Sequence, residues 1–311
     1  MIIAEELTRW FDDFRAVDRV CLNVQAGSVL VLLGQNGAGK TTTVRMLTSI
    51  LRPSSGRASV AGFDVVSQAD QVRKTVGVLT EHHGLYGRMN SEEYLEFFAS
   101  LYGLKAQQVR PRIRTLLDTF GLGDARKKRL GEYSKGMRQK LALVRAMIHD
   151  PAVLLLDEPT SAMDPESARL VRDSIHTLRS TGRTILLCTH NLAEAEELAD
   201  QVAIIRRGKI ILYDHLDKIK QQLLGPVEYE ARLAAPLSGW QPKLPAGVDM
   251  RERGEDWICF RVADPKHTNP QLLRQLLADQ LAVVSFQEVP RSLEKAFLNA
   301  VGLPQEAGDA A

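Results

Sequence analysis

Cysteine is scarce in this sequence: only three occur among 311 residues, Cys21, Cys188 and Cys259. They are widely spaced, and none has a neighbouring ligand at the spacing of a metal site. Isolated thiols without a secretion signal are typical of a reducing compartment, where disulfide cross-links are rare. We therefore expect these thiols to pack in the hydrophobic core.

Long hydrophobic runs, a leader segment and an excess of one charge are also missing. No stretch approaches the roughly 18 to 20 consecutive apolar residues of a membrane span, and the opening MIIAEE has no basic leader. A net charge of +2 and an isoelectric point near 8.4 are too mild to indicate nucleic-acid binding. With 44% hydrophobic and 25% charged residues, the composition predicts a soluble, cytosolic protein with one large domain and a smaller one.

A glycine-rich loop, GQNGAGKT at residues 34–41, is the most informative stretch. The apolar run at 29–33 before it suits a strand buried on both faces of a parallel sheet, and residues 42–51 after it have helical periodicity, with Pro53 ending the helix. This context predicts a phosphate-binding loop whose backbone N–H groups surround a polyphosphate. Lys40 is suited to neutralise the β- and γ-phosphates, and the Thr41 hydroxyl to coordinate magnesium. A chance glycine turn is the alternative.

Polar side chains follow three more apolar strands. Glu81 comes shortly after the run at 76–79, Asp157 and Glu158 end the run at 153–156, and His190 follows the run at 184–188. Parallel strands present such residues at one sheet edge, where open α/β sheets bind ligands. A magnesium ion at Asp157 would compensate the paired carboxylates, leaving Glu158 to activate water; an exposed acidic turn is the alternative.

The middle of the chain, residues 82–150, predicts a helical subdomain. Asn90 and Glu93 form a capping box before one helix, a second helix covers 107–120, and Ser134 is the N-cap of a third, whose N-terminus can hold an anion. His82 and His83 are expected in a loop, and the basic run at 126–129 on a solvated surface. Near the N-terminus, Trp10, Phe11 and Phe14 could stack on a base; the local pattern alone favours core packing.

Composition changes after residue 224. Gly225-Pro226 predicts a linker at this point. Before it, Asp164-Pro165 predicts the start of a helix, and the strand-like residues 202–205 and 210–213 predict a terminal hairpin. Strands are expected at 227–233, 257–262 and 282–286, and helices at 271–277 and 292–301. The predicted fold is α/β: a mostly parallel P-loop core with an antiparallel β subdomain and an inserted helical subdomain over 1–224, a small α+β accessory domain over 225–303, and a disordered tail at 304–311.

The order of these motifs resembles the ATP-binding subunit of an ABC transporter over residues 1 to about 220. The matched positions are the Walker A residues Gly34, Gln35, Asn36, Gly37, Ala38, Gly39, Lys40, Thr41 and Thr42, the Walker B residues 154–158, the signature-like Tyr133-Ser134-Lys135-Gly136-Met137, the D-loop Ser161-Ala162-Met163-Asp164, the switch histidine His190, and Phe11 as the ring that stacks on adenine. The last match reverses the core assignment of Phe11. The tail SLEKAF at 292–297 is similar to the C-terminal domain of bacterial drug-resistance and small-molecule exporters.

The resemblance implies a magnesium-dependent ATPase that works as a homodimer on the cytoplasmic side of the membrane. Two copies would enclose two ATP molecules, with Ser134, Lys135, Gly136, Met137 and Asp164 of one copy facing Walker A of the other, and would drive export through a separately encoded multi-span permease. The sequence departs from the family pattern at Glu81, where a glutamine is usual, and at Lys135 and Met137 of the signature. Glu81 is expected to hold a magnesium-bound water.

Three alternative functions fit the sequence less well. A soluble ABC ATPase acting on DNA or ribosomes usually carries a long coiled coil or two ATPase halves, and neither pattern is present. A P-loop kinase outside the family would have no reason to carry the signature and His190 together. A regulatory module that binds ATP without turnover is disfavoured by the intact Glu158.

Overall fold

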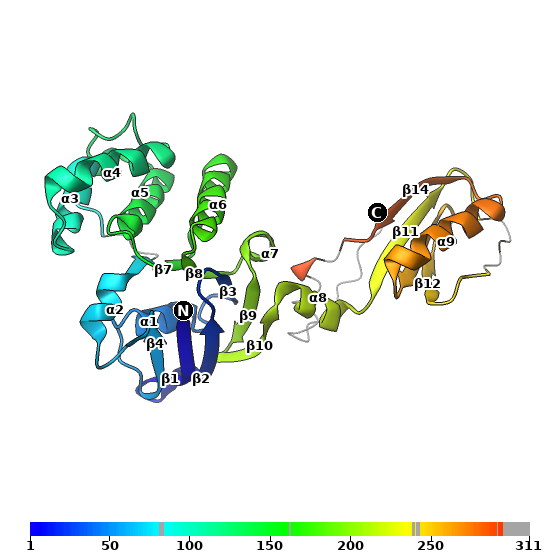
Figure 1. The fold of residues 1–311 in the computed structure, drawn as a ribbon, viewed down its shortest axis with the longest axis horizontal. Helices are drawn as coiled ribbons and strands as arrows, with labels where there is room; N and C mark the ends of the chain where they lie inside the picture. The colour runs from blue at the N-terminus through cyan, green and yellow to red at the C-terminus, as the bar shows by residue number, and fades with distance from the viewer. Residues whose placement is uncertain (81–83, 162, 238–239, 241–242, 291, 295–311) are drawn as a thin grey trace. The chain divides into compact units, whose positions relative to one another are not determined.

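The computed structural model describes residues 1–80, 84–161, 163–237, 240, 243–290 and 292–294 (Figure 1). The chain forms two compact units, Met1–Leu216 and Asp217–Ala311. Glu81, His82, His83, Ala162, most of the motif at 292–297, most of the helix expected at 292–301 and the tail at 304–311 lie outside the described residues.

The first unit contains two sheets. A four-stranded antiparallel sheet has the order β2-β1-β4-β5, and a six-stranded sheet has the order β10-β9-β3-β8-β7-β6. In the larger sheet every neighbouring pair is parallel except β10 with β9. The strands are β1 (Ile2–Phe11), β2 (Phe14–Val24), β3 (Val29–Leu33), β4 (Ser55–Val60), β5 (Phe63–Asp64), β6 (Val76–Leu79), β7 (Val153–Asp157), β8 (Thr184–Thr189), β9 (Gln201–Arg206) and β10 (Lys209–His215).

The helices at 91–101, 106–119 and 135–147 lie together, apart from the antiparallel sheet (Figure 1). Every residue of β3, β7 and β8 is buried, as expected for continuous apolar strands inside a parallel sheet. This confirms the predicted α/β core. The helices are α1 (Lys40–Leu47), α2 (Ala69–Thr75), α3 (Ser91–Leu101), α4 (Ala106–Thr119), the 3-10 turn η1 (Leu130–Glu132), α5 (Lys135–Met147), α6 (Pro165–Ser180) and α7 (Leu192–Leu198).

The register of the sheet sets the position of the site. Leu33 pairs with Thr189, and Asp157 pairs with Cys188. The residues that follow β3, β7 and β8 therefore emerge at one edge of the sheet, as predicted from the strand ends.

The predicted helix starts are found, but α1 is shorter than expected. Asn90 and Glu93 form the capping box of α3, and Ser134 caps α5. Instead of covering 42–51, α1 begins at Lys40 and ends at Leu47, because Ser49 has a left-handed backbone with φ of 58°. The Thr48 hydroxyl also donates to the carbonyls of Val44 and Arg45, a local bond that competes with further helix.

The aromatic residues near the N-terminus are not in the core. Phe11 and Phe14 pair across the hairpin between β1 and β2, and both are exposed, as is Trp10. The guanidinium of Arg15 lies 4.4 Å from the Trp10 ring centroid, and that of Arg9 lies 4.8 Å from the Phe11 ring, so arginines cover part of the rings. Core packing was therefore the wrong prediction for Trp10 and Phe14.

Two of the three cysteines are buried as expected. Cys188 lies in β8 and Cys259 in the second unit, whereas Cys21 is exposed on β2. Within the described residues no helix has the length and hydropathy of a membrane span, and no group of three or more His, Cys, Asp or Glu side chains is arranged as a metal site.

The second unit contains a four-stranded antiparallel sheet, ordered β12-β13-β11-β14, and the helix at 265–278 packs against it. Its core contains Ala231, Leu233, Ile258, Phe260, Leu272 and Leu276. The strand β12 was not predicted because charged residues dominate it, and α9 begins six residues before the predicted residue 271. The elements are α8 (Leu216–Leu224), β11 (Val227–Leu233), β12 (Val248–Arg253), β13 (Trp257–Val262), α9 (Pro265–Ala278) and β14 (Val283–Glu288).

Candidate nucleotide-binding site

The loop between β3 and α1 is folded around the Lys40 side chain. Its ammonium donates to the carbonyl oxygens of Gly34 at 2.6 Å and Gln35 at 3.3 Å. Gly39 has φ of 110° and immediately precedes the helix; a Cβ there would lie 2.7 Å from the Ala16 carbonyl oxygen. The loop therefore requires glycine at this position, and it directs the N-terminus of α1 toward the space beside Lys40, where an anion would be stabilised.

A polar cavity of about 470 Å³ opens beside this loop. Its size is that of a small-molecule site. Most of the predicted site residues line it, together with three that were not predicted to bind nucleotide: Phe14, Ala16 and Ser161. The full lining is Phe11, Phe14, Ala16, Gln35, Asn36, Gly37, Gly39, Lys40, Thr41, Thr42, Asp157, Glu158, Ser161 and His190.

Two oxygen-bearing side chains lie next to each other in the wall of the cavity. The Thr41 hydroxyl donates to the Asp157 carboxylate, with 2.6 Å between the oxygens, and Asp157 is almost completely buried. Hydroxyl and carboxylate oxygens are the donors that Mg²⁺ prefers. These residues, on α1 and β7, thus have the chemistry of a magnesium site.

Glu158 lies between two basic side chains. One carboxylate oxygen is 3.4 Å from the Lys40 ammonium and 2.9 Å from Nδ1 of His190. The Glu158 backbone is left-handed, with φ of 51°, a conformation that is strained for this residue type and is found preferentially at functional sites. Its side chain is therefore held at the edge of the sheet, in a position to contact a bound phosphate and a water molecule.

Gln139 fixes the backbone at Glu158 from a neighbouring helix. Its buried amide donates to the carbonyl oxygens of Glu158 and Pro159, each at 3.1 Å. Gln139 belongs to α5, the helix that begins at the signature-like segment. This contact was not predicted, although a glutamine on the same helical face as Ala142, Leu143 and Ala146 is a recognisable signal of a buried polar contact.

The signature-like segment and Asp164 lie outside this cavity but close to each other. Ser134 is exposed and accepts a hydrogen bond from the backbone N–H of Met137 at 3.2 Å. A Cβ on Gly136 would lie 4.0 Å from a carboxylate oxygen of Asp164. Asp164 in turn caps α6 by accepting from the Ser167 N–H, which lowers the pKa of its carboxyl group. Lys135 also does not line the cavity, so the predicted nucleotide-binding residues fall into two separate groups.

A buried carboxyl group supports the loop after Glu158. Glu194 of α7 is almost inaccessible to solvent and accepts a hydrogen bond from the Thr160 hydroxyl at 2.8 Å. Burial raises the pKa of Glu194, with the hydrogen bonds from Thr189 and Thr160 opposing the shift. In the unfolded chain the carboxyl group has its ordinary pKa and loses its proton at lower pH than in the folded chain. The free energy of unfolding therefore falls as pH rises from the ordinary pKa to the raised one.

Glu194→Gln is accordingly expected to raise the melting temperature at pH 8 by about 2–4 °C. Glutamine accepts the Thr160 hydrogen bond without a buried charge. The gain should shrink as pH falls to the ordinary range of a carboxyl group, where the wild-type side chain is also neutral. Thermal melts at several pH values test this, with the exposed Glu132→Gln as control. A gain that does not change with pH would contradict it.

Comparisons with known proteins place these motifs in one family. Residues 17–161 match the family model described as "ABC transporter". The chain is 42% identical over 224 residues to the ABC transporter ATP-binding protein NatA of Bacillus subtilis, covering 70% of this chain and 91% of the relative. It is 36% identical over 313 residues to the daunorubicin/doxorubicin resistance ATP-binding protein DrrA of Streptomyces peucetius, covering 96% and 92%.

Solved structures agree with this assignment. A structure described as the ATP-binding subunit of an ABC transporter superposes with a TM-score of 0.67 at 28% identity, covering 72% of this chain and 93% of that one. A second cassette, determined as a dimer bound to ADP and Pi, has a TM-score of 0.64 at 19% identity and covers 70% and 99%; at that identity it supports the fold. The chain belongs to the ABC transporter family and is an ATP-binding, ATP-hydrolysing subunit of that family.

Proposed function

We propose that this ATPase works as a homodimer on the cytoplasmic face of a membrane and drives export of a small molecule through a separate multi-span subunit. The observation that carries the proposal is the division of the nucleotide-binding residues. Lys40, Thr41, Asp157, Glu158 and His190 meet at one cavity, whereas the signature-like segment lies outside it. A second copy, placing its Ser134 at this cavity, would complete each site.

Within each site the side chains have separate roles. Lys40 and the N-terminus of α1 bind the β- and γ-phosphates, and Phe11 at the rim stacks on the adenine. Glu158 accepts a proton from the attacking water. His190, hydrogen-bonded to Glu158 at 2.9 Å, orients that carboxylate and contacts the γ-phosphate. The Ser134 and Asp164 helix ends of the second copy close the site over the phosphates.

Magnesium fits the oxygen ligands at Thr41 and Asp157, and when bound it would neutralise phosphate charge. Glu81 follows β6, next to β7 in the sheet, and we propose that it holds a magnesium-bound water. Glu81→Gln should then shift the magnesium concentration that gives half-maximal ATP hydrolysis, because the extra negative charge is removed. An unchanged titration, relative to an exposed control such as Glu132→Gln, would exclude this role.

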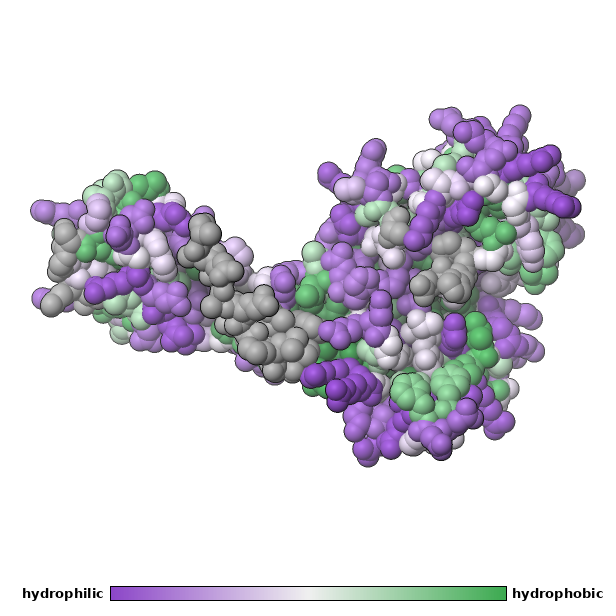
Figure 2. Space-filling view, turned by 180° about the vertical axis from the view of Figure 1, so that it is seen from behind, coloured by the Kyte–Doolittle hydropathy of each residue, from purple (hydrophilic) through white to green (hydrophobic). Residues whose placement is uncertain are grey.

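An exposed aromatic surface is suited to receive the membrane subunit. Tyr86, Phe97, Leu101 and Tyr102 are all at least one-third exposed, with Leu101 at 65%. Tyr86 packs edge-on against Phe97, with 5.9 Å between ring centroids. Figure 2 shows hydrophobic side chains at the edge of the helical layer among hydrophilic neighbours. Apolar side chains gathered on a surface are typical of interaction sites, so we propose that this surface docks against a membrane chain.

Export is supported by the relative named for daunorubicin and doxorubicin resistance, which aligns over almost the whole chain. An affinity pull-down of the tagged chain from detergent-solubilised membranes of its native cell tests the proposal. A stoichiometric multi-span polypeptide is expected. Recovery with ribosomes or DNA-repair proteins would leave the ATPase intact and replace transport with the soluble alternative.

A matched pair of variants sharpens this test. Leu101→Glu should lose the membrane chain in the pull-down, because it places a charge in the apolar surface. Ile50→Glu, at a residue that is 63% exposed and follows α1 in the sequence, is the control. Equal recovery with both variants would show that the partner binds elsewhere.

A further inference from the structure

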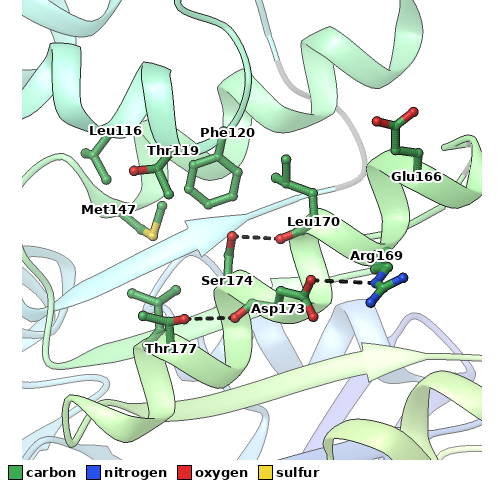
Figure 3. Close-up of a pocket in the computed structure, with 11 residues that line it drawn as sticks. Leu116, Thr119, Phe120, Met147, Glu166, Arg169, Leu170, Asp173, Ser174 and Thr177 are labelled. Carbon is green, nitrogen blue, oxygen red and sulfur yellow. Dashed lines mark hydrogen bonds and ion pairs between the residues drawn. The ribbon is translucent and has the colours of Figure 1, made fainter.

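A second cavity, of about 490 Å³, lies between α4, the end of α5 and α6 (Figure 3). It has no lining residue in common with the nucleotide cavity. Figure 3 shows Leu116 from α4, Phe120 at its C-cap, Met147 from α5 and Leu170 from α6 facing the same space. Phe120 and Met147 are almost fully buried. A cavity of this size with apolar walls is typical of a small-molecule site.

The hydroxyl groups in the wall are already satisfied within their own helices. Ser174 donates to the Leu170 carbonyl at 2.8 Å, Thr177 to the Asp173 carbonyl at 3.0 Å, and Thr119 to the Thr115 carbonyl at 2.8 Å. They present methyl and methylene groups to the cavity and require no polar partner there. The wall is therefore suited to an apolar body, and Met147 can adapt to its outline because methionine side chains are flexible.

Charged side chains stand only on the α6 side of the cavity, and acidic ones are in excess. Glu166 and Asp173 carry carboxylates and Arg169 carries the one guanidinium. The Arg169–Asp173 pair is long, at 3.9 Å, and highly exposed on both sides. Together with Glu166, these side chains leave one negative charge in excess at this side of the cavity. Glu166 lies in the first turn of α6, where the helix dipole stabilises its ionised form. The charges at this side of the cavity thus attract a cation.

We propose that this cavity binds an amphipathic organic cation. Its apolar body fills the space between α4 and α6, and its ammonium group lies at the α6 rim, where the carboxylates of Glu166 and Asp173 outnumber the guanidinium of Arg169. The inference does not depend on the transport function, since it rests on a different set of residues in the same unit.

Fluorescence titration of the full-length chain with rhodamine 6G, a planar organic cation, tests the proposal. Ser174→Phe fills the cavity and should weaken dye binding at least about 10-fold, because a well-packed site does not absorb an added ring. Ser180→Phe is the matched control: it adds the same ring at the last residue of α6, outside the cavity. Equal affinity of the two variants would overturn the site.

The charge assignment has its own test, in case Ser174→Phe fails to fold. Glu166→Gln combined with Asp173→Asn should weaken rhodamine 6G binding about 5-fold and leave the neutral dye N-phenyl-1-naphthylamine unaffected, since only the cation loses an attraction. An unchanged affinity for the cation, or tighter binding of an anionic dye to the wild type, would refute a cation site. ATP affinity, measured on each variant, separates this result from failure of the nucleotide site.

Discussion

Glu158→Gln is expected to lower the rate of ATP hydrolysis by about 10²- to 10³-fold while ATP binding is retained. Glutamine has the shape of the carboxylate but cannot accept a proton from water, and loss of a positioned general base has an effect of this size. The substitution also removes the negative charge 3.4 Å from the Lys40 ammonium. No carboxylate then competes with phosphate for the Lys40 ammonium, so ATP should bind at least as tightly as in the wild type.

Single-turnover kinetics and an ATP-binding titration on the same preparation measure the two effects separately. Glu132→Gln, an exposed carboxylate in η1 away from the cavity, makes the same chemical change and should leave both unaltered. In the presence of ATP, size-exclusion chromatography should show Glu158→Gln as a trapped dimer. Hydrolysis at the wild-type rate would remove Glu158 from the role of general base and leave His190 as the next residue to test.

The sheet and its edge could be predicted because apolar strands have a strong local signal. The runs that became β3, β7 and β8 are continuous and end in polar residues, and parallel pairing brings such ends together. The cavity residues Lys40, Asp157, Glu158 and His190 followed from this rule. The two helix ends at Ser134 and Asp164 were also predictable from their capping residues. Their closeness to each other was not, since it depends on where the tertiary fold places the starts of α5 and α6.

What the sequence did not reveal depends on contacts between distant segments. Gln139 reaches the Glu158 carbonyl from a helix that begins more than twenty residues earlier. The end of α1 is set by the left-handed backbone of Ser49. A glycine at this position would have indicated such a backbone in the sequence, but a serine does not. In β12, charged residues at most positions hide the alternation of Val248 and Met250 toward the core, and strand signals of this kind depend on burial more than on residue type.

Lys40→Met is expected to weaken ATP binding by about 10- to 100-fold, because hydrogen bonds from a charged donor contribute about 1.5–3 kcal/mol each. The Lys40 ammonium is held by the Gly34 and Gln35 carbonyls and by Glu158. Its position beside the loop is therefore fixed by the chain itself, and little reorganisation opposes phosphate binding. Methionine keeps the length of the side chain but leaves the Glu158 carboxylate facing the phosphates without a compensating cation.

The loss should consequently be larger for ATP than for adenosine, which has no phosphate to neutralise. Isothermal titration with both ligands measures this difference, and Lys209→Met is the matched control. Lys209 lies near the same loop, on β10, but its ammonium is exposed and 3.3 Å from Asp18 rather than in the cavity. A double variant with Glu158→Gln should recover part of the affinity, because the uncompensated carboxylate is then gone. Equal losses for ATP and adenosine would mean that Lys40 supports the loop and does not bind phosphate.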